Sequence, residues 1–179
     1  MPLTARSQLL ALAASLWAPV AAGAEEAHLH ACDLLSAGEV AAVVGFNVTR
    51  GRTAQEVNEA GRRSSTCSWV APLAQGEAPD PRQPIGGVSF AILNVMVWPE
   101  GPEGAKKYLQ DFRDAAESHA ISRAPTPVTI GDEGLIWGSG VAVRKKAVSF
   151  GISVHLTSGD TRAHRGMEQE LAHKIAARL

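Results

Sequence analysis

Residues 88–98 read VSFAILNVMVW, and this stretch decides the fold. Neighbouring side chains of an extended strand point to opposite faces of its sheet. Here apolar residues fill both faces: Val88, Phe90, Ile92, Met96 and Trp98 on one, and Ala91, Leu93, Val95 and Val97 on the other. A strand that is apolar on both faces has to be covered on both faces. We therefore predict a central strand here, with packed layers above and below the sheet.

The chain after this strand predicts one helix, three strands and a last helix. Between residues 102 and 119 apolar side chains recur at spacings of three and four, as on a helix lying on a sheet. Strands are expected at 135–137, 141–143 and 148–156, with a Gly-Ser-Gly hairpin at 138–140 and a turn at 144–146. Apolar residues recurring every four positions from Met167 to Leu179 predict the C-terminal helix.

The chain before residue 88 predicts a short helix and two strands. Ser36 and Glu39 match a capping box, so a helix is expected at 36–44, with Gly45 as its left-handed end. Strands are expected at 46–49 and 65–70, joined by a polar, exposed connection over 50–63. The Pro- and Gly-rich stretch at 72–87 is either a mobile or a functional loop.

The predicted element order is thus α-β-β-β-α-β-β-β-α. Consecutive strands without long crossovers favour antiparallel pairing, and segregated helices favour the α+β class. We expect a single, mostly antiparallel sheet flanked by helices, in one domain over residues 32–179.

Residues 1–24 have the pattern of a cleaved signal peptide. Arg6 precedes an apolar run at 9–18, and Ala22-Gly23-Ala24 supplies the small residues that a signal peptidase accepts. The run is too short to cross a bilayer, which takes about 20 residues. We expect an exported protein, periplasmic or secreted, with a flexible lead-in at 25–31 and no stable insertion in a membrane.

Cys32 and Cys67 are the only cysteines, and an even pair in an exported chain is typical of a disulfide. In the chain-entropy estimate, closing a loop of this length stabilises a domain by about 3–4 kcal/mol. A redox or metal site is the alternative, but the chain has no Cys-x-x-Cys spacing and no further ligand nearby. We predict a structural bridge.

The charge balance excludes two classes of partner. Of 179 residues, 17 are Lys or Arg and 18 are Asp or Glu, which gives a formal net charge of −1. A nucleic-acid binder usually presents a strongly basic face. A protein held on anionic lipid needs a basic cluster as well. We expect neither kind of partner.

Three short motifs resemble a group of small exported bacterial proteins and lipoproteins of unknown function. They are Cys32-Asp33-Leu34-Leu35-Ser36 with Glu39-Val40, then Cys67-Ser68-Trp69, and then Gly131-Asp132-Glu133. The resemblance spans about residues 32–178. It implies the Cys32–Cys67 bridge and a sandwich similar to the PsbP-like fold, and it implies no activity. Unlike the lipoprotein members, this chain lacks a convincing lipidation sequence before Cys32.

No pattern in the sequence amounts to a catalytic centre or a cofactor site. Ser153 and His155 share a strand face, but neighbours at i and i+2 stand roughly 6–7 Å apart, too far for a nucleophile and its base. His28 and His30 could hold Zn²⁺ or Cu²⁺ only weakly, because they lie on the lead-in. We assign no cofactor, no metal and no catalytic residue.

The sequence therefore predicts a non-catalytic binding or accessory module for a small ligand or an envelope protein. The candidate ligand-contacting residues are Trp69, Trp98, Trp137 and His155, with core packing as the alternative for the tryptophans. Two other functions stay open: an enzyme whose site assembles around His155 or His119, and a weak metal-handling protein using His28 and His30.

Overall fold

The computed structural model describes residues 29–72, 88–138, 140–157 and 161–179, and all descriptions below concern these residues. The predicted signal peptide at 1–24 and nearly all of the 72–87 loop lie outside them.

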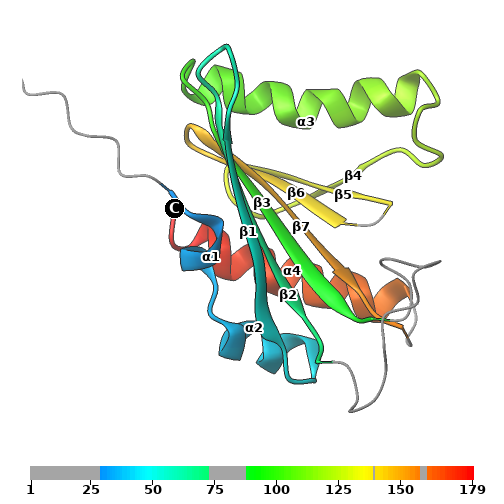
Figure 1. Ribbon diagram of the computed structural model, residues 1–179. Helices are drawn as coiled ribbons and strands as arrows, with labels where there is room; N and C mark the ends of the chain where they lie inside the picture. Colours follow the sequence, from blue (N-terminus) through cyan, green and yellow to red (C-terminus); the bar gives the residue numbers. More distant parts are fainter. Residues whose placement is uncertain (1–28, 73–87, 139, 158–160) are drawn as a thin grey trace, which may run out of the picture.

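One antiparallel sheet of seven strands forms the centre of the molecule, in the order β1-β2-β3-β7-β6-β5-β4 (Figure 1). Its strands are β1 (Thr49–Val57), β2 (Arg63–Val70), β3 (Phe90–Val97), β4 (Thr126–Val128), β5 (Glu133–Trp137), β6 (Gly140–Lys145) and β7 (Val148–His155). The helices are α1 (Ala31–Leu34), α2 (Ala37–Val44), α3 (Pro102–Glu117) and α4 (Thr161–Ala176). The predicted α+β class with a single antiparallel sheet is confirmed.

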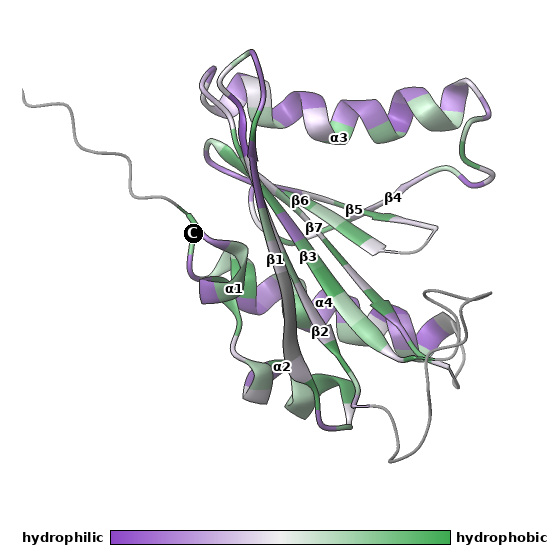
Figure 2. Ribbon diagram, in the orientation of Figure 1, coloured by the Kyte–Doolittle hydropathy of each residue, from purple (hydrophilic) through white to green (hydrophobic). Residues whose placement is uncertain are grey.

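The helices cover the two faces of the sheet unequally (Figure 1). On one face α1, α2 and α4 enclose the main core, in which Phe150, Ile152, Leu171 and Ile175 are fully buried. On the other face α3 alone covers a smaller cluster of Met96, Trp98 and Ala105. Figure 2 shows hydrophilic and hydrophobic residues alternating along α3, as expected of a helix with one buried side.

β3 lies between β2 and β7, which confirms the central strand predicted from residues 88–98. Leu93 and Val95 are buried in the main core, while Met96 packs under α3. The expected cover of both faces is only partly present, because the side chain of Ile92 is 36 % exposed. Among the described residues, α3 packs over the Met96 end of that face and does not reach the other end.

The N-terminal helix follows its sequence signals. Ser36 accepts a hydrogen bond from the Glu39 N–H, the Glu39 carboxylate reaches back to Ser36, and Gly45 adopts φ 80. A disulfide joins Cys32 to Cys67, as predicted, with a Cα–Cα distance of 5.0 Å. The bridge connects α1 to β2, so α1 is fixed on the sheet.

Several predicted boundaries are wrong. The expected exposed connection at 50–63 is largely the strand β1. Because β1 lies at the edge of the sheet, its outer side faces no partner strand, and a polar composition is tolerated there. The prediction also lacked β4, a fourth strand after α3. It contains Pro127, which is acceptable because β4 forms the other edge of the sheet. α1 is also absent from the prediction. β6 extends to Lys145, so the turn falls at Lys146, with φ 55.

Candidate functional site

Trp137, the last residue of β5, borders two adjoining cavities that we call together the Trp137 pocket. One has a volume of about 120 Å³ and contains Arg123, Arg165 and Ile136 in its wall. The other has a volume of about 280 Å³ and is formed by residues 120–123 with Trp137 and Gly138. Because Arg123, Trp137 and Gly138 line both cavities, the two spaces are neighbours around the indole ring.

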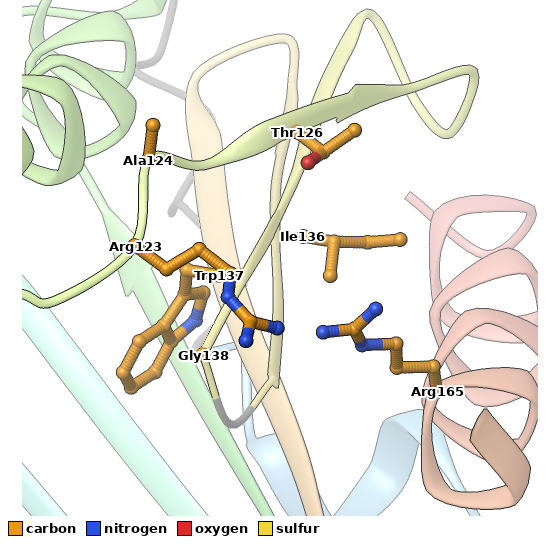
Figure 3. Close-up of a pocket in the computed structure, with 7 residues that line it drawn as sticks. All are labelled: Arg123, Ala124, Thr126, Ile136, Trp137, Gly138 and Arg165. Atoms are coloured by element: carbon orange, nitrogen blue, oxygen red, sulfur yellow. The ribbon is translucent and has the colours of Figure 1, made fainter. Parts of the chain in front are cut away.

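The local fold brings three separate segments to this pocket. α3 ends at Glu117, and His119 takes a left-handed φ of 62, so the chain turns back toward the sheet and carries Arg123 to the end of β5. The indole of Trp137 is supported by Phe112 of α3, with ring centroids 5.0 Å apart. α4 supplies Arg165 from the opposite side (Figure 3).

The guanidinium groups of Arg123 and Arg165 point toward one another across the smaller cavity (Figure 3). Among the described residues, neither group has a carboxylate within salt-bridge distance. The Nε atom of Arg165 is buried and has no hydrogen-bond partner in that same part of the chain. Buried donors in folded proteins are nearly always paired, so this atom requires an explanation.

Glu168 lies one turn after Arg165 on α4, and its side chain is buried. Its Oε1 accepts a hydrogen bond from the N–H of Val154, at 3.0 Å. Burial raises the pKa of Glu168 from 4.5 to about 7, opposed by that hydrogen bond and by the charge of Arg165. Glu168 is therefore a weak counter-ion for Arg165, because near neutral pH it is ionised only part of the time.

The structure separates the three candidate tryptophans. Trp69 is buried in the main core, on the face of α1 and α4. Trp98 is buried under α3, where its Nε1 donates to Ser149 Oγ at 2.7 Å and the guanidinium of Arg62 lies 4.8 Å from its ring centroid. Only Trp137 of the three lines one of the cavities described above.

The two histidines considered for catalysis are exposed, and neither lines the Trp137 pocket. His155 is exposed and stacks on Phe90, with ring centroids 5.0 Å apart. His119 is exposed, and its Nδ1 lies 3.0 Å from the Glu117 carbonyl oxygen. No carboxylate is hydrogen-bonded to either ring within the described ranges.

The metal candidates are only partly described. His30 contacts the side chain of Gln55, while His28 lies outside the described residues. Across the described ranges, no three His, Cys, Asp or Glu side chains are grouped so that they could hold a metal ion.

Sequence reasoning missed Arg123 and Arg165. Arg123 stands in a connection with no motif, and nothing in the sequence places it near α4. A signal existed for Arg165, because α4 has no acidic residue in its first turn and carries Arg162 and Arg165 near its N-terminal end. Basic side chains are unfavourable at the positive end of a helix dipole, so their presence there is typical of a site that needs positive charge.

No family model matches the sequence, and no curated protein matches it. The fold is similar to the crystal structure of the extracellular domain of PknH from Mycobacterium tuberculosis, with a TM-score of 0.53 and 10 % sequence identity. The match covers 82 % of this chain and 92 % of that chain. At this identity the similarity concerns the fold alone. In the described part of the chain, no helix combines the length and the apolarity needed to cross a bilayer.

Proposed function

We propose that this chain is an exported, non-catalytic binding module and that the Trp137 pocket is its ligand site. The observation that carries the proposal is the convergence of three chain segments on two adjoining cavities beside Trp137, with two arginines facing one another across the smaller cavity. Ligand sites are typically concave, mostly apolar and provided with a few polar groups that orient the ligand.

The size of the pocket favours a small molecule over a protein partner. Sites for drug-sized ligands measure roughly 300–1,000 Å³. The two cavities here have volumes of about 120 and 280 Å³, so together they reach only the lower end of this range and suit a small ligand. An enzyme around His155 or His119 lacks comparable support, because neither ring lines these cavities.

Three observations support export. The N-terminal 24 residues have the pattern of a signal peptide. The Cys32–Cys67 disulfide is the kind of bond that persists in oxidising compartments. The fold is similar to a domain described as extracellular. Membership of the exported bacterial group named above, with its PsbP-like sandwich, belongs to the same proposal.

The test compares a variant that fills the pocket with a matched control. Ala124→Trp places a large side chain in the pocket wall, whereas Ala177→Trp adds the same side chain near the C-terminal end of α4. Wild type purified from its host's envelope or medium should retain a small molecule in native mass spectrometry. Ala124→Trp should lose this ligand and Ala177→Trp should keep it. Recovery of no ligand from wild type, or equal recovery from both variants, would overturn the assignment.

Export has a separate readout. N-terminal sequencing of the protein recovered from the envelope or medium should begin at Glu25. An uncleaved N-terminus on protein found only in the cytoplasm would contradict export and would leave the pocket assignment unaffected.

A further inference from the structure

We propose that the Trp137 pocket binds a small organic anion, whose carboxylate or phosphate group lies between Arg123 and Arg165 and whose apolar part packs beside Trp137. The proposal rests on the proposed function, since it names the ligand class of the same pocket. Figure 3 shows the two guanidinium groups that carry it.

The two arginines carry like charges at close quarters. Two guanidinium groups that face one another repel, and an anion between them relieves that repulsion. Three other arginines of the described chain form ion pairs: Arg113 with Glu133, Arg144 with Asp132, and Arg178 with Glu39. Arg123 and Arg165 have no such carboxylate among the described residues. Glu168 interacts with Arg165 only through its partial negative charge, so an anion bound between the two arginines would be stabilised by both of them.

The shape of the guanidinium group also suits an anion with two oxygens. Nε and a neighbouring Nη form a planar fork that matches two oxygens of a carboxylate or phosphate. In Arg165 the Nε is buried and has no hydrogen-bond partner among the described residues, so within them one arm of the fork is unused. Arg123 lies on an exposed loop opposite, from which it can close on a ligand held by Arg165.

Apolar side chains surround the two charges. Ile136 and Ala124 stand in the wall of the smaller cavity, and Ile121 and Trp137 in that of the larger one. A bare inorganic ion would leave this apolar surface unused. An anion with an apolar body, flat enough to lie along the indole, would contact both cavities.

The carboxyl beside Arg165 on α4 competes only weakly with a bound anion. Glu168, the nearest described carboxyl on α4, is a weak counter-ion because its proton leaves only near neutral pH. The electrostatic surroundings of the pocket are therefore more favourable to an anion than to a neutral or cationic ligand.

The experiment uses four probes and calorimetric titration of the mature protein at constant ionic strength. Benzoate and phenyl phosphate carry the anion on a flat apolar body, benzamide has the shape of benzoate without its charge, and inorganic phosphate has the charge without the body. Benzoate or phenyl phosphate should bind at least tenfold more tightly than benzamide and than inorganic phosphate. The tighter of the two identifies the ligand as a carboxylate or a phosphate.

The arginine variants assign the effect to the pocket. Arg123→Gln and Arg165→Gln should each weaken binding of the preferred probe by about tenfold or more, as expected for a lost charge-assisted hydrogen bond. Arg162→Gln removes the same charge from an exposed position on the same helix and should change affinity less than about threefold. Arg165→Lys keeps the charge but not the fork, and it should give an intermediate affinity.

The outcomes separate this inference from the proposed function. Equal binding of benzoate and benzamide, unchanged affinity in both pocket variants, or failure of all four probes would each overturn the anion assignment. None of these results affects the Ala124→Trp comparison, which follows the retained ligand and not a chosen probe. Failure of the proposed function would instead appear in that comparison, as recovery of no ligand from the wild-type protein in native mass spectrometry.

Discussion

The carboxyl of Glu168 on α4 accepts a hydrogen bond from the backbone N–H of Val154, near the end of β7, at 3.0 Å. The Glu168 side chain is only 3 % exposed, and burial raises its pKa to about 7. α4 is therefore attached to the sheet through a group that titrates near neutral pH, one turn from an arginine of the candidate site.

This contact predicts that Glu168→Gln removes a pH dependence of stability. Because the folded-state pKa lies above the ordinary value of 4.5, the unfolded chain releases this proton first as the pH rises from about 4.5 to about 7. The contribution of Glu168 is thus fully present below pH 4.5 and is lost by about pH 7. The loss reaches up to about 3 kcal/mol, and a neutral Gln, which can still accept from Val154, avoids it.

Urea unfolding between pH 4.5 and 8 measures this difference. The free energy of unfolding of wild type should fall relative to that of Glu168→Gln across the window and then stay constant. Carboxylates with lowered pKa values, such as Asp132 and Glu133, contribute equally to both proteins and cancel in the comparison. If the free energies of unfolding of the two proteins change with pH in parallel, that result would contradict a buried Glu168 with a raised pKa.

Anion binding should become tighter as the pH falls from 8 to 6. Protonation of Glu168 removes the negative charge that interacts with Arg165, so the guanidinium becomes fully available to a bound anion. Benzoate remains ionised in this range, as carboxylates titrate at about pH 4. Calorimetry at three pH values should show the trend in wild type and its loss in Glu168→Gln.

Other titratable groups lie on the same elements and need a control. His164 precedes Arg165 on α4 and has a buried Nε2, and His155 is on β7. His164→Gln and His155→Gln should therefore keep the pH trend of wild type. A trend that persists in Glu168→Gln and disappears in His164→Gln would assign the effect to the histidine.

Removal of the disulfide should destabilise the domain without changing its fold. The Cys32→Ala, Cys67→Ala double variant should lose about 3–4 kcal/mol of unfolding free energy by the chain-entropy estimate. Part of the α1 attachment remains, because the N–H of Ala31 donates to Ser65 Oγ at 3.0 Å. Urea unfolding of wild type with and without reductant is the matched comparison, and an unfolding midpoint that reductant leaves unchanged would count against a structural role for the bridge.

Gly131→Ala should be strongly destabilising, because glycine is needed there for two reasons. Gly131 has φ 67, and a Cβ would lie 2.6 Å from the carbonyl oxygen of Arg144 and from Val143 Cγ1. We expect a loss of about 2–3 kcal/mol in thermal or urea unfolding. Gly38→Ala is the control: the position lies in α2 with open space around it, so the same change should be neutral or stabilising by roughly 0.5–1 kcal/mol.

The parts of the fold that local physics determines could be predicted from the sequence. The capping box of Ser36 and Glu39 and the two apolar faces of β3 each indicated the correct element. The bridge between Cys32 and Cys67 could be expected because they are the only two cysteines. β1 could not be found in this way, because an edge strand needs neither apolar alternation nor β-branched residues when one edge and much of its surface face solvent.

The candidate site was only partly accessible to sequence reasoning. The aromatic character of Trp137 made it a candidate, but the same argument applied to Trp69 and Trp98, which are buried elsewhere. Periodicity alone does not tell which face of a sheet receives a helix. Arg123 and Arg165 meet only because the loop after α3 turns back toward the N-terminal end of α4, a tertiary event without a local signal.

A crystal structure of the mature protein with 4-bromobenzoate tests the central claim most directly, because the anomalous signal of bromine locates the ligand without ambiguity. The account predicts the carboxylate between the guanidinium groups of Arg123 and Arg165 and the ring beside Trp137. Bromine found only elsewhere, for example on the open face at Phe90 and His155, or an empty Trp137 pocket at saturating ligand, would contradict it.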